Sequence, residues 1–248
     1  MNKSTYSPIV ELRQYTLRPG GRDELIELFE REFVETQEAV GIQVIGQFYD
    51  LDDPDRFVWL RGFNDMSARE QSLNAFYSGP IWRAHRDAAN ATMVDSDNVL
   101  ILHLVHRTSG FSLNNEHRPP LESRAKRGGF VTATIYYFDA PIQPDFINYF
   151  ENTIQPALMD ADISTLAYFI TEESPNTYPK LPVREGEHVF IWFAGFPDQD
   201  AYELQTAMLA ESNLWKNEIS RYLKRRLNRK PELLKLSPTP RSRLTGRS

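Results

Sequence analysis

The sequence predicts an α+β fold in which two repeats pack their antiparallel sheets face to face as one intramolecular barrel. Two segments repeat each other, FVWLRGFND at 57–65 and FIWFAGFPD at 190–198. Tryptophans recur at a spacing of 133 positions in two pairs, Trp59 with Trp192 and Trp82 with Trp215. Both halves follow the order strand, helix, strand, strand, helix, strand. One face of each expected sheet is rich in aromatic side chains, and a face of that kind is normally covered.

Composition excludes several classes of protein. Hydrophobic residues make up 41% of the 248 residues and aromatic residues 12%, which is enough for a packed core. Cysteine is absent, which excludes disulfides, thiolate metal sites and a cysteine nucleophile. A formal net charge of −6 argues against a nucleic-acid partner. Neither an apolar signal core nor a run of ~20 apolar residues occurs, so we expect a soluble cytoplasmic protein with no membrane partner.

The first repeat spans 8–107. Its opening residues alternate and are rich in strand formers until Pro19-Gly20-Gly21. Apolar residues at helical spacing then run from Leu25 to Phe33, which indicates a helix with one buried stripe. The expected elements are a strand at 9–17, a helix at 23–40, strands at 42–49 and 57–63, a helix at 65–93 broken near Ser78-Gly79-Pro80, and a strand at 99–105.

The second repeat spans 129–237 and matches the first at two spacings. Early residues pair at 121 positions, as Tyr15 does with Tyr136, whereas later ones pair at 133. The second repeat therefore carries 12 extra residues, which fall in a proline-rich segment at 171–187 that we expect to be a surface loop. The expected elements are strands at 131–138, 163–170, 188–196 and 233–236, with helices at 145–159 and 199–227.

A linker and a tail complete the chain. Residues 108–128 include Asn114-Asn115, Pro119-Pro120 and a basic run at Arg124, Lys126 and Arg127, a composition typical of a linker. Residues 238–248 are polar, and we expect them to form a disordered tail.

Strand alternation sorts the side chains onto two faces. Val10 and Leu12 suit the helix-covered side of the first strand. The opposite face is then aromatic and polar, and we expect the two repeats to cover it by turning these faces toward each other. The expected interior residues are Glu11, Arg13, Tyr15, Phe57, Trp59, Arg61, Phe63, Thr132, Thr134, Tyr136, Phe190, Trp192 and Phe196.

Three features of the first repeat occur together: the opening ELRQYTLRPG at 11–20, the aromatic strand with Trp59, and Pro80-Ile81-Trp82 followed by Arg83 and Arg86. In this combination the chain resembles the NIPSNAP family. The resemblance covers residues 8–105 well and 129–236 more weakly, because Thr132-Ala133-Thr134 replaces the Glu-Leu-Arg opening and Asn213-Leu214-Trp215 replaces the proline motif. The resemblance implies ferredoxin-like repeats of the dimeric α+β barrel class. That class includes cofactor-free monooxygenases, isomerases and haem-dependent enzymes, and the family itself implies no settled reaction.

We predict a ligand site in the barrel interior. Arginines bind carboxylate or enolate oxygens in bidentate fashion, and Tyr15 could donate to the same oxygen. The alternative to a ligand site is that Glu11 and Arg61 form a cross-strand ion pair beside Tyr15 with a structural role only. Ala194 and Thr134 replace Arg61 and Arg13 in the second repeat, so we expect the polar site in the first. The predicted ligand-binding residues are Glu11, Arg13, Tyr15, Trp59, Arg61, Tyr136 and Trp192.

Histidine gives weaker signals. His85 follows Trp82 on an expected helix and could act as a general base or an axial haem ligand, or lie on the surface without a role. His103 and His106 are three apart in a strand and so face opposite ways, which makes a poor metal pair. We therefore predict no metal site and no cofactor, and we interpret the four tryptophans mainly as packing anchors.

Three functions are compatible with these residues. The first is binding of a small apolar or aromatic ligand in the barrel, with cofactor-independent oxygenation or isomerisation suggested by fold analogy alone. The second is a non-catalytic scaffold or interaction protein, and the third is haem binding through His85. A cavity of about 300 Å³ lined by Arg13, Tyr15 and Arg61 would favour the first, and a filled interior the second. Whether the chain is an enzyme, and whether it forms a homo-oligomer, is left open.

Overall fold

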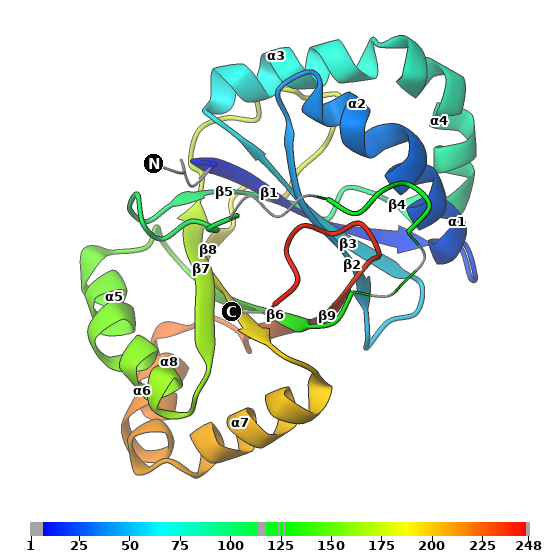
Figure 1. The fold of residues 1–248 in the computed structure, drawn as a ribbon. Helices are drawn as coiled ribbons and strands as arrows, with labels where there is room; N and C mark the ends of the chain where they lie inside the picture. The colour runs from blue at the N-terminus through cyan, green and yellow to red at the C-terminus, as the bar shows by residue number, and fades with distance from the viewer. Residues whose placement is uncertain (1–6, 114–117, 124, 126, 247–248) are drawn as a thin grey trace, which may run out of the picture.

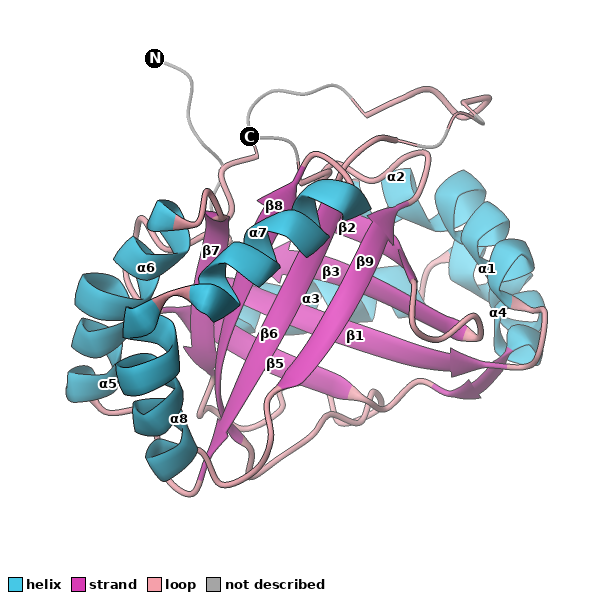
Figure 2. Cartoon of the chain, turned by 90° about the horizontal axis from the view of Figure 1, so that it is seen from below, coloured by secondary structure: helices cyan, strands magenta, loops and turns pink. Residues whose placement is uncertain are grey.

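The computed structural model describes residues 7–113, 118–123, 125 and 127–246, and its strands form one closed antiparallel barrel (Figures 1 and 2). Going round the barrel the order is β3-β2-β9-β6-β8-β7-β5-β1, and β1 pairs with β3 to close it. The short β4(Met93–Asp95) pairs with the end of β1. The barrel strands are β1(Ile9–Leu17), β2(Gln43–Asp50), β3(Arg56–Phe63), β5(Val99–Leu104), β6(Phe130–Phe138), β7(Ser164–Thr171), β8(His188–Phe196) and β9(Glu232–Pro238). The predicted α+β barrel is confirmed.

Each repeat places its helices on its own side of the barrel, so the two helical layers lie on opposite sides (Figure 1). The first layer consists of α1(Arg22–Leu28), the π-helical turn η1(Phe29–Phe33), α2(Val34–Glu38), α3(Met66–Tyr77) and α4(Pro80–Thr92). The second consists of α5(Pro144–Tyr149), the π-helical turn η2(Phe150–Ile154), α6(Gln155–Asp160), α7(Gln199–Glu211), the π-helical turn η3(Trp215–Ile219) and α8(Ser220–Arg226).

Irregular details recur in both repeats, which supports the duplication more strongly than the regular elements do. The π-helical turns η1 and η2 begin at Phe29 and Phe150, which are 121 positions apart. Asp65 and Asp198, which are 133 apart, each cap the following helix by accepting a hydrogen bond from a backbone N–H. The matched strands β2 and β7 bulge at equivalent places, between Val44 and Gly46 and between Thr165 and Ala167.

The barrel interior is a packed apolar core, and the predicted assignment of the faces is wrong. Val10 and Leu12 point into the barrel, where side chains from all eight barrel strands form one buried cluster. Trp59 instead packs under the helices of its own repeat, with its ring centroid 4.7 Å from that of Phe29. Trp192 lies likewise under the second helical layer, 6.3 Å from Phe150.

The physical reason for the inversion is volume. A closed eight-stranded barrel is just wide enough for side chains to fill, and medium-sized aliphatic residues suit it. The barrel also holds Phe48, Phe169 and Phe193, but the larger indole of Trp59 lies between sheet and helix, where Phe29 and Phe33 supply apolar partners. Alternation reveals two faces but does not say which one is inside.

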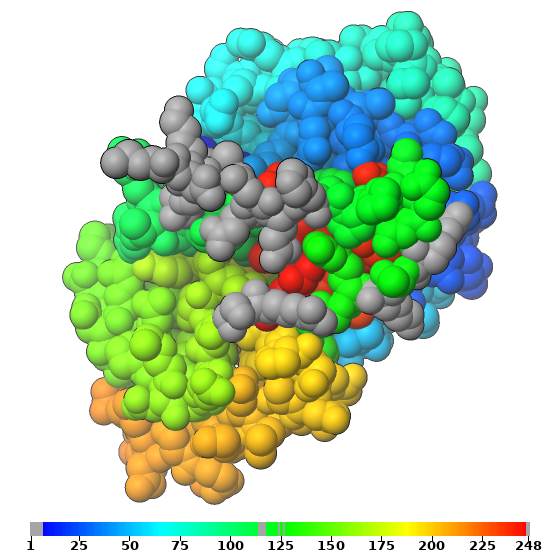
Figure 3. All heavy atoms as spheres, viewed as in Figure 1, coloured from blue at the N-terminus to red at the C-terminus, as the bar shows by residue number. Residues whose placement is uncertain are grey.

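The linker and the tail close one end of the barrel. Phe111, Leu113 and Leu244 are buried in the same cluster as the strand side chains of the interior. In the view of Figure 3 the described linker (green) and C-terminal residues (red) lie near the middle of the molecule. The predicted linker is therefore also part of the core. Asn114, Asn115, His117, Arg124 and Lys126 lie outside the described residues.

Residues 238–246 differ from the disordered tail that we expected. Pro238 ends β9, and the backbone N–H groups of Thr239 and Leu244 donate to Gln47 and Ile45 of β2. Polar side chains are buried here with partners, since the Thr239 hydroxyl donates to Glu30 and Arg241 pairs with Glu35. Polarity alone could not reveal those partners, because they lie about 200 positions away in the sequence. Residues 247 and 248 lie outside the described chain.

The proline-rich loop at 171–187 joins β7 to β8, as predicted, but it also covers the first repeat. Asn176 and Thr177 accept hydrogen bonds from Arg69 of α3. Tyr178 stacks on Tyr77 with ring centroids 5.9 Å apart. The extra residues of the second repeat thus shield the first.

In the described part of the chain, no helix combines the length and the apolarity needed to cross a membrane.

Candidate functional site

Four charged side chains meet beneath the helices of the first repeat, and we call Glu11, Arg13, Arg61 and Arg69 the charged quartet. All four are at most 1% exposed. Glu11 Oε2 accepts from Arg13 Nη1 at 2.6 Å and from Arg61 Nε at 2.7 Å, while Oε1 accepts from Arg69 Nε at 2.6 Å. Glu11 and Arg61 lie directly opposite in the β1–β3 register. The cross-strand ion pair is therefore real, and it is part of a larger cluster.

Burial and charge act in opposite directions on the pKa of Glu11. Burial alone would raise it, but Arg61, Arg13 and Arg69 together hold the pKa of this carboxyl well below its usual range. Arg13 Nε also donates to the Tyr15 hydroxyl at 2.9 Å, and burial raises the pKa of Tyr15. The carboxylate of Glu11 is consequently held ionised within the quartet.

No organic ligand fits beside the quartet. The adjoining cavity has a volume of about 30 Å³ and is lined by Tyr15, Gln37, Trp59 and Tyr77 together with apolar side chains, mostly from the helices. The sequence prediction therefore brought Glu11, Arg13, Tyr15, Trp59 and Arg61 together correctly. It placed them wrongly in the barrel interior, and the cavity of about 30 Å³ at this place is far below the size of about 300 Å³ that would favour a ligand site here.

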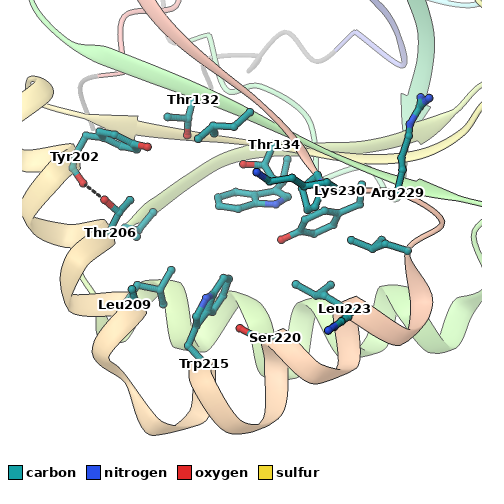
Figure 4. Close-up of a pocket in the computed structure, with 18 of the residues that line it drawn as sticks. Thr132, Thr134, Tyr202, Thr206, Leu209, Trp215, Ser220, Leu223, Arg229 and Lys230 are labelled. Carbon is teal, nitrogen blue, oxygen red and sulfur yellow. Dashed lines mark hydrogen bonds between the residues drawn. The ribbon is translucent and has the colours of Figure 1, made fainter. Parts of the chain in front are cut away.

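The second repeat holds a cavity of about 720 Å³ at the matching place, between its sheet and its helices (Figure 4). The sheet side is formed by β6, β8 and β9, and the helix side by α7, η3 and α8. Of the predicted residues, Tyr136 and Trp192 line it. The complete lining is Thr132, Thr134, Tyr136, Ile163, Trp192, Phe196, Tyr202, Thr206, Leu209, Ala210, Trp215, Ser220, Leu223, Lys224, Leu227, Arg229, Lys230, Pro231 and Leu233.

Loss of the charged quartet creates this space. At the same spacings of 121 and 133, the quartet is replaced in chain order by Thr132, Thr134, Ala194 and Tyr202. Thr132, Thr134 and Tyr202 line the large cavity, as does Ala210, which replaces Tyr77. At two of these lining positions a glutamate and an arginine have become threonines, and the volume that the longer side chains would fill is open to a ligand.

The cavity wall is largely aromatic and aliphatic, with few polar groups. Figure 4 shows Trp215 and Leu223 rising from the helix side toward Thr132 and Thr134 on the sheet side. The Trp192 indole N–H is buried without a hydrogen bond of good geometry. Burial raises the pKa of Tyr136 to about 12, and the nearby Trp192 indole opposes part of that rise.

Two lysines give the cavity a positive edge. Lys224 and Lys230 belong to the lining, and neither is in an ion pair with a described residue. Lys230 extends into the cavity in Figure 4, whereas Arg229 points away from it. Arg229 is engaged elsewhere, because it pairs with Glu187 at 3.1 Å and lies over the ring of Tyr137. The lining residues include no aspartate, glutamate or histidine.

The predicted histidine roles find no support in the geometry. His85 of α4 is half-buried, pairs with Glu32 at 3.5 Å and lines neither cavity described above. His103 pairs with Glu172 and His106 with Glu151. Among the described residues, no group of three or more His, Cys, Asp or Glu side chains could hold a metal ion.

Sequence reasoning missed the helix-side residues of the cavity, chiefly Tyr202, Thr206, Leu209 and Ala210. A signal was present in the alignment of the two repeats. Wherever the second repeat substitutes a smaller residue for a larger one on the helix-facing side, space can open. The absence of Arg13 and Arg61 from the second repeat predicts a polar site in the first, and this inference overlooks the space that smaller residues leave.

The fold and the sheet–helix cavities define an intramolecular α+β barrel of two ferredoxin-like repeats, with the larger of the two cavities described above in the second repeat. The NIPSNAP family model matches residues 10–106. An uncharacterized NIPSNAP-like domain protein from Burkholderia xenovorans is 32% identical over 41% of this chain and 87% of its own, with a TM-score of 0.37. The chain belongs to the NIPSNAP family, and its first repeat carries that membership.

Several solved structures match nearly the whole chain. A "putative monooxygenase" from Lactobacillus acidophilus NCFM is 13% identical, with 94% of each chain covered and a TM-score of 0.53. An anthrone oxidase-like protein is 14% identical, with 96% of this chain and 95% of its own covered and a TM-score of 0.54. At this identity the similarity shows a shared two-repeat barrel fold. No curated protein matches the chain.

Proposed function

We propose that the second repeat binds a flat, largely apolar small molecule that carries an anionic or carbonyl oxygen. The observation that carries the proposal is the 720 Å³ cavity between sheet and helices, which lies within the usual size of ligand sites. Trp192, Trp215 and Phe196 supply aromatic walls. The unpaired Trp192 N–H and the two lysines supply donors for an oxygen at one end of the ligand.

Binding is better supported than catalysis. Removing a proton from a ring substrate needs a general base, and the lining offers only lysines, tyrosines, hydroxyls and an arginine. With a pKa of about 12, Tyr136 stays protonated near neutral pH, so its hydroxyl would donate to an oxyanion rather than accept a proton. If the protein oxygenates or isomerises its ligand, Tyr136 would stabilise the developing charge.

The two alternative functions have less support. A scaffold needs no cavity, and the barrel interior is indeed filled, but the second-repeat cavity remains to be explained. Haem binding through His85 would need space for a macrocycle on that side of the chain. The neighbouring cavity of about 30 Å³ does not provide that space.

Narrowing the cavity should weaken binding without unfolding the protein. Ala210 lines the cavity and Ala207, on the same helix, does not. Both are exposed, so Ala210→Phe and Ala207→Phe form a matched pair. Using fluorescence titration with 9-anthracenecarboxylate, we expect Ala210→Phe to weaken binding at least tenfold, which corresponds to about 1.4 kcal/mol. Ala207→Phe should bind like the wild type. Equal affinities for the two variants would place the ligand elsewhere.

The lysine edge should recognise charge. Replacing Lys230 with alanine removes a cation that extends into the cavity (Figure 4). Affinity for 9-anthracenecarboxylate should fall about three- to tenfold, because a hydrogen bond to a charged group contributes about 1.5–3 kcal/mol and exposure of the lysine reduces that. Affinity for neutral 9-anthracenemethanol should stay within about twofold. A parallel loss for both probes would show that Lys230 acts through shape and not through charge.

A further inference from the structure

The charged quartet encloses more positive than negative charge. Three guanidinium groups surround one carboxylate, and Glu11 is the only acidic partner of Arg13, Arg61 and Arg69 among the described residues. Their formal charges leave an excess of two positive charges in a region shielded from water. Buried charges are favourable only when opposite charge and hydrogen bonds compensate them. Cation–π contacts of Arg13 and Arg61 with Trp59 compensate in part.

Three donors at this place have no protein partner. Arg61 Nη2, Arg69 Nη2 and Trp59 Nε1 are buried and make no hydrogen bond to any described residue. Trp59 also forms part of the wall of the cavity of about 30 Å³. Arg61 reaches the same wall, because its Nη1 donates to Gln37 and Tyr77, both of which line the cavity.

The polar groups that line this cavity are arranged to donate. The Tyr15 hydroxyl accepts from Arg13 at 2.9 Å and the Tyr77 hydroxyl from Arg61 at 3.5 Å, so each keeps its own hydrogen for another acceptor. The Gln37 oxygen is likewise occupied by Arg61. A particle in the cavity is therefore close to O–H and N–H donors, and the positively charged guanidinium groups of the quartet lie behind these donors.

We propose that the first repeat binds a monatomic monovalent anion, of the size of chloride, in this cavity. About 30 Å³ holds one particle of water size and excludes sulfate, phosphate and organic acids. The rest of the wall consists mainly of apolar side chains such as Phe33, Phe76 and Trp82, which suits a weakly hydrated anion better than a strongly hydrated one. The anion accepts from Trp59 Nε1 and lowers the excess charge of the quartet. This site is separate from the second-repeat cavity and does not depend on its function.

The test compares halide with a large anion at equal ionic strength. Thermal unfolding of the full chain is followed in sodium chloride, sodium bromide and sodium gluconate, which screen surface charges alike. Binding to the folded state alone should raise Tm in a saturable manner, by roughly 5–10 °C at a hundredfold excess over Kd. Crystals grown in bromide should give an anomalous peak within hydrogen-bonding distance of Trp59 Nε1.

Matched variants separate this site from general salt effects. Trp59→Phe removes the unpaired donor and should abolish the halide-dependent rise in Tm. Trp192→Phe, the same change at the matched position of the second repeat, should leave that rise intact. If Trp59→Phe does not fold, Tyr77→Phe at a half-buried position takes its place and should weaken the halide effect at least threefold. Equal Tm values in halide and gluconate, an unchanged response in Trp59→Phe, or a missing bromide peak would each overturn the proposal.

Discussion

Replacing Glu11 with glutamine should reduce the free energy of unfolding by about 3–5 kcal/mol, because it leaves three buried guanidinium groups without a carboxylate. Glutamine is nearly isosteric, so little of the loss would come from packing. Urea unfolding at pH 7 measures it. The effect should be larger than that of removing a typical surface ion pair. Solvent screening limits the contribution of such a pair to the free energy of unfolding to less than about 1 kcal/mol.

The pH dependence of the same variant follows from the depressed pKa of Glu11. In the unfolded chain a glutamate titrates near pH 4.3, at about its ordinary pKa, whereas in the folded protein it stays ionised to lower pH. The stabilisation is therefore complete above about pH 5 and is lost as pH falls below the unfolded-state pKa toward the folded one. The stability difference between wild type and Glu11→Gln should shrink between pH 5 and pH 2.

Two controls make the result specific. Glu24→Gln, on the exposed side of α1, should change stability by no more than about 0.5 kcal/mol. Adding Arg69→Met to Glu11→Gln removes one of the uncompensated cations, so the double variant should be more stable than the sum of the two single effects. A Glu11→Gln protein within 1 kcal/mol of the wild type at pH 7 would show that the quartet is not held as described.

Much of the architecture could be predicted because it depends on local signals. Alternation, turn residues and helical spacing located every barrel strand to within about two residues. The matched spacings of the duplication identified which elements of the two repeats correspond to each other. The inside and outside of the barrel could not be predicted in the same way, since Trp59 and Val58 sit on adjacent, equally buried positions. What decides between them is the volume available in a closed barrel.

Three members of the charged quartet were predicted to lie together, but in the wrong place. Glu11, Arg13 and Arg61 share one face of two neighbouring strands, so their meeting follows from the register alone. Arg69 joins them from α3, and a helix–sheet contact of this kind has no local signature. The large cavity depends on what is absent from the second repeat, as at Thr134 and Ala210. A single sequence shows such absences only when its repeats are compared position by position.

Local signals also could not show that the linker is part of the core. One of its side chains should contribute as much to the free energy of unfolding as a buried strand residue does. Phe111 is 3% exposed and packs inside the barrel against Phe169 and Phe193, with ring centroids 5.3 and 4.9 Å away. Phe111→Ala should lower the free energy of unfolding by about 3–5 kcal/mol, since it removes a large buried ring and leaves a cavity. Urea unfolding with an unchanged m-value would assign the loss to the folded state.

Leu121 provides the control within the same linker. Its side chain is 48% exposed, so Leu121→Ala should change the free energy of unfolding by no more than about 0.5 kcal/mol. A linker that only connects the repeats would tolerate both changes equally, and that result would contradict the packing of Phe111 in the barrel. A loss confined to Phe111→Ala would instead mean that neither repeat completes its own core. The segment between the repeats then belongs to the fold, and separating the repeats should cost both of them stability.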